Sequence, residues 1–120
     1  MFKSAYQDGD CVEIFSPAGK DPAVEWKLTN KVARLYDKGI KGYALSVSGG
    51  ATSKMQIPKA PKGLLGLRQR YLVVQVLTAI SEDKPFSLEL GLTDVGGTRR
   101  RLVLSSSFRA LHCTPLHAQV

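Results

Sequence analysis

The stretch FSLELGLTDVGGTRRRLVLS, residues 86–105, decides the fold class of this 120-residue chain. Apolar and polar residues alternate from residue 86 to residue 92, as they do in a strand that buries one face. Asp94 and the glycines at 96 and 97 are typical of a tight turn. Residues 100–105 have the composition of a second strand, so the stretch predicts an antiparallel hairpin.

Short runs of the same kind recur along the chain, separated by glycine and proline. Residues 24–28 alternate cleanly, and so do the last five residues, 116–120. Residues 43–47 and 54–57 flank a loop that contains a glycine pair, and we expect them to form another hairpin. The pattern therefore predicts an all-β chain of about nine short strands.

Residues 71–80 are apolar at almost every position. A strand in the centre of the fold, covered on both faces, has this pattern. A buried helix has it too, but the β-branched residues and the glycines just upstream favour the strand.

Positive charge is concentrated in the middle of the chain. The net charge is +7, and residues 31–73 carry nine lysines and arginines against a single acidic residue, Asp37. Such an excess indicates an acidic partner, which can be a nucleic acid, a membrane surface or an acidic protein such as tubulin. Residues 58–70 contain two prolines and four of these cations, and we expect them to form an exposed basic loop.

Residues able to carry out catalysis are scarce. His112 and His117 are the only imidazoles, and together with Cys113 they fall short of the four ligands of a structural zinc site. No arrangement of nucleophile, base and orienting group stands out. We therefore expect no enzyme, no metal and no cofactor. Without a signal peptide or a membrane span, Cys11 and Cys113 are predicted to be reduced, packed thiols in an intracellular chain.

The arginine triplet at 99–101 is the densest cluster of charge. Strand alternation predicts Arg99, Arg101 and Val103 on one face, and Leu102 and Leu104 on the core face. The triplet is either a solvated strand end or a clamp for phosphate or carboxylate groups. Trp26 and Tyr43 are predicted to point inward as core residues.

Several motifs, in their order and spacing, resemble the cilia- and flagella-associated protein 20 domain family. They are Met1-Phe2-Lys3, Tyr6-Gln7, Phe15-Ser16, Gly19-Lys20, Trp26, Ile57-Pro58, Leu65-Gly66-Leu67, Leu72-Val73 and Arg99-Arg100-Arg101. Residues 54–59, 69–73 and 114–118 look most similar to the longer, domain-containing members.

The resemblance implies an antiparallel jelly-roll-like β-sandwich that is similar in shape to carbohydrate-binding modules. It also implies a structural component of ciliary or flagellar axonemes, within the cytoskeleton. The domain of the family is longer than this chain, so we expect residues 1–120 to be the N-terminal portion of a single domain that continues. Such a portion would leave sheet edges and apolar faces uncovered.

Together these observations predict a non-enzymatic protein that docks on tubulin or on other axonemal proteins. The candidate contacts are the exposed cations of the loop and of the triplet, namely Lys54, Lys59, Lys62, Arg68, Arg70, Arg99 and Arg101. No membrane and no small-molecule substrate are expected, and nucleic acid is disfavoured because the cations are not interleaved with aromatic residues. The alternative is a carbohydrate-binding module-like domain, which requires outward-facing aromatic side chains.

Overall fold

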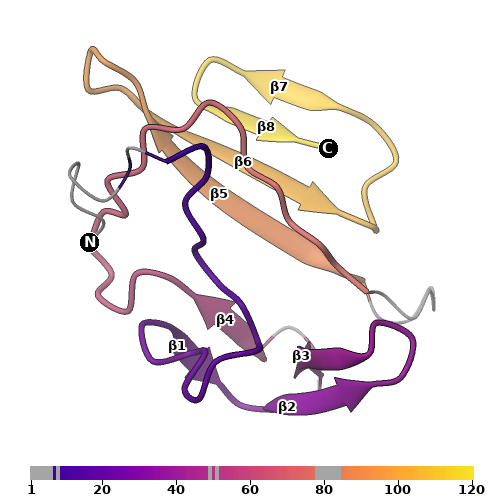
Figure 1. Ribbon diagram of the computed structural model, residues 1–120. Helices are drawn as coiled ribbons and strands as arrows, with labels where there is room; N and C mark the ends of the chain where they lie inside the picture. Colours follow the sequence, from indigo (N-terminus) through magenta and orange to yellow (C-terminus); the bar gives the residue numbers. More distant parts are fainter. Residues whose placement is uncertain (1–6, 8, 49, 51, 78–84) are drawn as a thin grey trace. The chain divides into compact units, whose positions relative to one another are not determined.

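The computed structural model describes residues 7, 9–48, 50, 52–77 and 85–120, and this part of the chain is all-β (Figure 1). It contains eight strands and no helix, so it also holds no helix that could span a lipid bilayer. The strands are β1 (Lys27–Thr29), β2 (Val32–Asp37), β3 (Gly42–Val47), β4 (Lys54–Gln56), β5 (Ser87–Thr93), β6 (Arg99–Ser105), β7 (His112–Thr114) and β8 (His117–Gln119). The all-β prediction is confirmed, and the antiparallel sheets are consistent with a β-sandwich.

The chain divides into two compact units, residues 1–73 and residues 74–120. In the first unit, β1 pairs with β4 and β2 pairs with β3, both antiparallel. The predicted hairpin between residues 43–47 and 54–57 is therefore wrong. Both segments are strands, but each pairs with a strand that precedes it in the sequence.

Asp37 explains why β3 pairs backward with β2. Its Oδ1 accepts hydrogen bonds from the backbone N–H groups of Gly39 and Ile40, at 2.7 and 3.0 Å. An aspartate that caps its own turn in this way closes a hairpin locally. Lys41 then takes a positive φ of 51° before β3 begins.

β1 is shorter than the alternation of residues 24–28 predicts. The N–H of Val24 donates to the carbonyl of Asp21 at 3.2 Å, and the N–H of Trp26 donates to that of Ala23 at 2.9 Å. These two turns occupy backbone donors that a strand would use. The strand consequently begins only at Lys27.

The second unit holds a four-stranded sheet in the order β5-β6-β8-β7 (Figure 1). The predicted hairpin at residues 86–105 is confirmed, with Ser87 opposite Ser105 and Thr93 opposite Arg99. Gly97 supplies the positive φ of the turn, 84°. The alternation at residues 116–120 is also confirmed as a strand, because β8 lies parallel to β6 and antiparallel to β7.

Residues 71–77 do not form the predicted central strand. No strand is assigned to them, and Tyr71 is 88 % exposed. An apolar run is stable as a central strand only when neighbours pair with its backbone and cover both of its faces, and the described residues supply no pairing strand. Residues 78–80, which complete the predicted segment, lie outside the described part of the chain.

Val103 is the one buried apolar side chain among the described residues, with 7 % of its surface exposed. It was predicted to face outward with Arg101, and this prediction is wrong. Val103 lies in the middle of β6, opposite Glu89 of β5 and beside Gln119 of β8, so strands flank it on both sides. Leu104, predicted to face the core, is 40 % exposed.

Truncating Val103 should destabilise the four-stranded sheet. Val103→Ala removes two buried methyl groups, and at roughly 0.8 kcal/mol for each carbon we expect the free energy of unfolding to fall by about 1.5 kcal/mol. Urea denaturation followed by circular dichroism measures this change. Leu104→Ala, on the same strand, is the matched control and should cost less. An equal or larger loss in the control would contradict the packing described here.

Candidate docking surface

Five of the seven predicted contact residues lie on one exposed segment of the first unit. Lys54 begins β4, and the other four follow it in an irregular stretch that contains no described strand. The prediction of an exposed basic loop at residues 58–70 is confirmed, since each of its cations is exposed. These five residues, which we call the loop cations, are Lys54, Lys59, Lys62, Arg68 and Arg70.

Gln7 holds the loop in place from a distant point of the sequence. Its side chain is buried; the Nε2 group donates to the carbonyl of Gly66 at 2.8 Å, and Oε1 accepts from the N–H of Arg68 at 3.2 Å. An amide that donates and accepts across two residues fixes the backbone between them. Gln7 thereby holds the backbone at Arg68, whose N–H also donates to Oε1 of Gln69 at 3.2 Å; the sequence had marked Gln7 only as part of a family motif.

The loop cations keep their charge available for a partner. Within the described residues, the two ion pairs are both in the second unit, so none involves a loop cation. The first unit as a whole carries twelve lysines and arginines against six acidic residues, a net charge of +6. An excess of this size attracts acidic partners and raises the rate at which they associate.

The arginine triplet on β6 has three different environments. Arg101 pairs with Glu89 at 2.8 Å, and Arg100 pairs with Asp94 and also donates from Nε to the carbonyl of Pro115 at 3.1 Å. Arg99 is exposed and forms no ion pair with a described residue. Of the two predicted contacts in the second unit, Arg101 is engaged in an ion pair, whereas Arg99 forms none with a described residue. Arg100 has a structural role that the sequence did not show.

Asp94 organises the turn that precedes this triplet. The guanidinium of Arg100, hydrogen-bonded to its carboxylate, lowers the pKa of Asp94 below its usual value, and the backbone N–H of Thr98, 2.9 Å away, lowers it further. Both donors favour the ionised form. The turn between β5 and β6 is therefore held together by a charge.

The aromatic residues contradict the prediction for Tyr43 and leave Trp26 half-buried. Trp26 packs edge-to-face against Phe15, with ring centroids 5.6 Å apart. Tyr43 is 45 % exposed, so it does not point into a core. Strand alternation separates the two faces of β3, but it does not tell which face other parts of the chain cover.

The other reactive side chains gather into no site. Cys11 and Cys113 are both exposed rather than packed, and they belong to different units. Among the described residues, no group of three or more histidine, cysteine or acidic side chains is placed to hold a metal ion.

An all-β protein with a braced, exposed cationic loop is thus the class that the structure defines. Comparison with models of known protein families identifies the family within this class. The model of the CFA20 domain matches residues 1–120, the whole chain, and the chain therefore belongs to this family. The resemblance noted in the sequence is confirmed, and the name of the family points to an association with cilia and flagella.

Removing the side chain of Gln7 should release the loop. Gln7→Ala eliminates two hydrogen bonds of a buried amide, so we expect a loss of about 1–3 kcal/mol in the free energy of unfolding. The backbone amide of Arg68 should exchange faster with deuterium. Gln75→Ala, at an exposed position, is the control and should change neither quantity. Unchanged exchange at Arg68 in the Gln7 variant would contradict the bracing role.

Asp94→Asn should weaken the β5–β6 hairpin in a pH-dependent manner. The pKa of Asp94 is lower in the folded chain than its unfolded value of 3.8, so its charge stabilises the fold above that pH. The stabilisation is lost as pH falls through the lower, folded pKa. Wild type should therefore exceed Asp94→Asn in stability at pH 7, and the two should converge as the pH falls below the folded pKa.

Thermal unfolding at several pH values measures this difference. Glu89→Gln breaks the other exposed ion pair of the same hairpin and serves as the matched control. Because that pair caps no turn, its loss should matter less at pH 7. A difference between wild type and Asp94→Asn that persists unchanged below the folded pKa would show that the charge of Asp94 is irrelevant.

Proposed function

We propose that this protein is a non-enzymatic structural component of the ciliary or flagellar axoneme. It docks on microtubules, or on proteins associated with them, through the loop cations. Membership of the CFA20 family supports the cellular setting. The observation that carries the docking surface is that none of the five exposed loop cations forms an ion pair with a described residue, while Gln7 holds the backbone at Gly66 and Arg68.

The geometry of the loop suits an extended acidic surface. Long lysine and arginine side chains on an irregular segment adapt to carboxylates that are not arranged in a fixed pattern. Because the backbone at Gly66 and Arg68 is held by Gln7, less conformational entropy is lost when the loop binds. Arg99, in the second unit, adds a further exposed cation.

The carbohydrate-binding alternative depends on whether Tyr43 or Trp26 can stack on a sugar ring. Tyr43 faces outward, as a sugar platform requires. However, the guanidinium of Arg34 lies over its ring, 4.1 Å from the centroid, so that face is not free for a pyranose ring to stack on. Trp26, the other candidate, is half-buried against Phe15.

Co-sedimentation with taxol-stabilised microtubules at increasing salt tests the docking proposal. Wild type should pellet at low salt and be released as the Debye length shortens. Lys59→Glu combined with Lys62→Glu should reduce the pelleted fraction at least about tenfold at low salt and flatten the salt dependence.

The control variant carries the same change of charge on another part of the same unit. Lys20→Glu combined with Lys27→Glu alters two exposed cations outside the loop. It should pellet nearly as well as wild type. Equal losses in both variants would indicate non-specific attraction to net charge, and no loss in the loop variant would rule out the loop as the docking surface.

A further inference from the structure

One face of the β2–β3 hairpin carries a row of four side chains. None of these residues belongs to the loop cations. The register places Arg34 opposite Leu45 and Tyr36 opposite Tyr43, and paired residues of an antiparallel ladder share a face. Arg34, Tyr36 and Tyr43 are exposed, Tyr36 by 58 %, and Leu45 is half-buried. We call the four side chains, Arg34, Tyr36, Tyr43 and Leu45, the hairpin face.

The hairpin face is rigid before any partner arrives. The rings of Tyr36 and Tyr43 pack edge-to-face, with centroids 5.4 Å apart. Arg34 is fixed twice, since its guanidinium lies over the ring of Tyr43 and its Nη2 donates to the carbonyl of Pro17 at 2.7 Å. Side chains that are already ordered lose little entropy on binding, and tyrosine and arginine are the residues on which interfaces most often depend.

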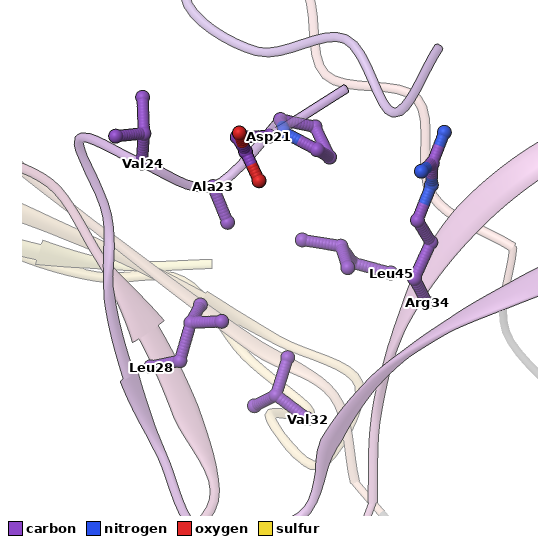
Figure 2. Close-up of a pocket in the computed structure, with 8 residues that line it drawn as sticks. Asp21, Ala23, Val24, Leu28, Val32, Arg34 and Leu45 are labelled. Atoms are coloured by element: carbon purple, nitrogen blue, oxygen red, sulfur yellow. The ribbon is translucent and has the colours of Figure 1, made fainter. Parts of the chain in front are cut away.

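A hollow of about 380 Å³ adjoins one end of this face. Figure 2 shows Leu28 and Val32 rising into it, Leu45 entering from the side of Arg34, and Ala23 opposite them. Its lining is mainly apolar, and Asp21 and Arg34 are its charged members. The apolar part of this opening accepts an apolar side chain, and the guanidinium of Arg34 beside it is engaged by the carbonyl of Pro17 and the ring of Tyr43.

The other end of the hairpin face is cationic. Lys38 and Lys41 lie in the turn between β2 and β3, and both are exposed without an ion pair to a described residue. The nearby Asp37 directs its Oδ1 at the backbone N–H groups of the turn. A partner that lies along the hairpin therefore meets an apolar hollow first and afterwards two exposed lysines that form no ion pair with a described residue.

We propose that the hairpin face binds an extended acidic polypeptide segment of a partner protein, with an apolar anchor side chain in the hollow. Four positions separate Leu45 from Lys41, which is roughly 13 Å along a strand. The acidic residues of the partner consequently lie about three to six positions from its anchor. Asp21 in the lining of the hollow disfavours acidic residues on the other side.

Single-stranded nucleic acid fits this face less well. Stacking of bases requires open aromatic faces, whereas Arg34 covers Tyr43 and the two tyrosine rings are perpendicular. The hollow offers apolar surface where a nucleic acid would present phosphate or a polar base edge. The inference concerns a surface distinct from the loop cations and stands independently of docking on microtubules.

The test uses a fluorescein-labelled peptide of about twelve residues, with one leucine followed by glutamates three to six positions later. Binding to the full chain is followed by fluorescence polarisation and by the chemical shifts of the backbone amides. Two matched peptides replace the leucine by serine or the glutamates by glutamine. A labelled oligothymidylate of similar length is the fourth probe.

The leucine–glutamate peptide should bind at least about tenfold more tightly than either matched peptide, with shifts concentrated in residues 21–24 and 32–47. Tyr36→Ser should abolish this preference. Lys38→Gln combined with Lys41→Asn should weaken binding by up to about tenfold at low salt. Asparagine tolerates the positive φ of Lys41, so this second variant keeps the hairpin folded. Lys59→Glu with Lys62→Glu is the control and should bind the peptide as wild type does.

Three results would overturn the inference. They are equal affinity for the leucine and serine peptides, shifts confined to the loop cations, and tighter binding of oligothymidylate than of any peptide. Microtubule pelleting of the same variants separates this inference from the proposed function. Tyr36→Ser should pellet as wild type does, so lost peptide preference with retained pelleting supports a second surface. If the wild-type protein pellets with microtubules but binds no peptide, the proposed function is retained and the peptide-binding role of the hairpin face is rejected.

Discussion

Backbone hydrogen bonding between β5 and β6 is the interaction on which the second unit depends. Seven residue pairs form this ladder, and β8 and β7 are added to it along the other edge of β6. Among the described side chains only Val103 contributes a buried apolar group, so side-chain packing adds less than in a domain with a filled core. The turn at Asp94 consequently has unusual weight, because it sets the register of the ladder.

The loop cations and the hairpin turn of the first unit share one structural arrangement. In each, a polar side chain satisfies backbone groups and thereby fixes the cations beside it. Gln7 does this for the loop at Gly66 and Arg68, and Asp37 does it for the hairpin turn. Cations that form no ion pair with a described residue are suited to recognition rather than to stability, since like charges gathered in one unit repel one another.

Local turn chemistry explains which parts of the fold could be predicted from the sequence. The hairpin at residues 86–105 was predictable because Asp94 and Gly97 lie directly between two alternating runs. The glycine pair near residue 50 gave an equally strong signal, yet β3 and β4 pair elsewhere. Asp37 was the informative residue there, because its turn joins β2 to β3.

Residues whose roles depend on distant contacts could not be found in this way. Gln7 acts on a loop about sixty positions away, and Arg100 is engaged by Asp94 and Pro115 rather than by solvent. The cations of residues 58–70 were identified correctly as exposed because proline and clustered charge exclude a strand interior by themselves. The apolar run at residues 71–77 led to a wrong strand prediction. A strand-like composition forms a strand only when another strand pairs with its backbone.

The parallel pairing of β6 with β8 has a consequence for the order of folding. β5 and β6 are joined by a short turn and can pair within microseconds, whereas Arg101 and His117 are sixteen positions apart and must wait for β7 and its turn. During that interval the N–H groups of Arg101 and Ser105, which later donate to Leu116 and Val120, remain open along one edge of β6. Until residues 112–120 close this edge, the hairpin of a newly made chain is open to pairing with a strand from another copy.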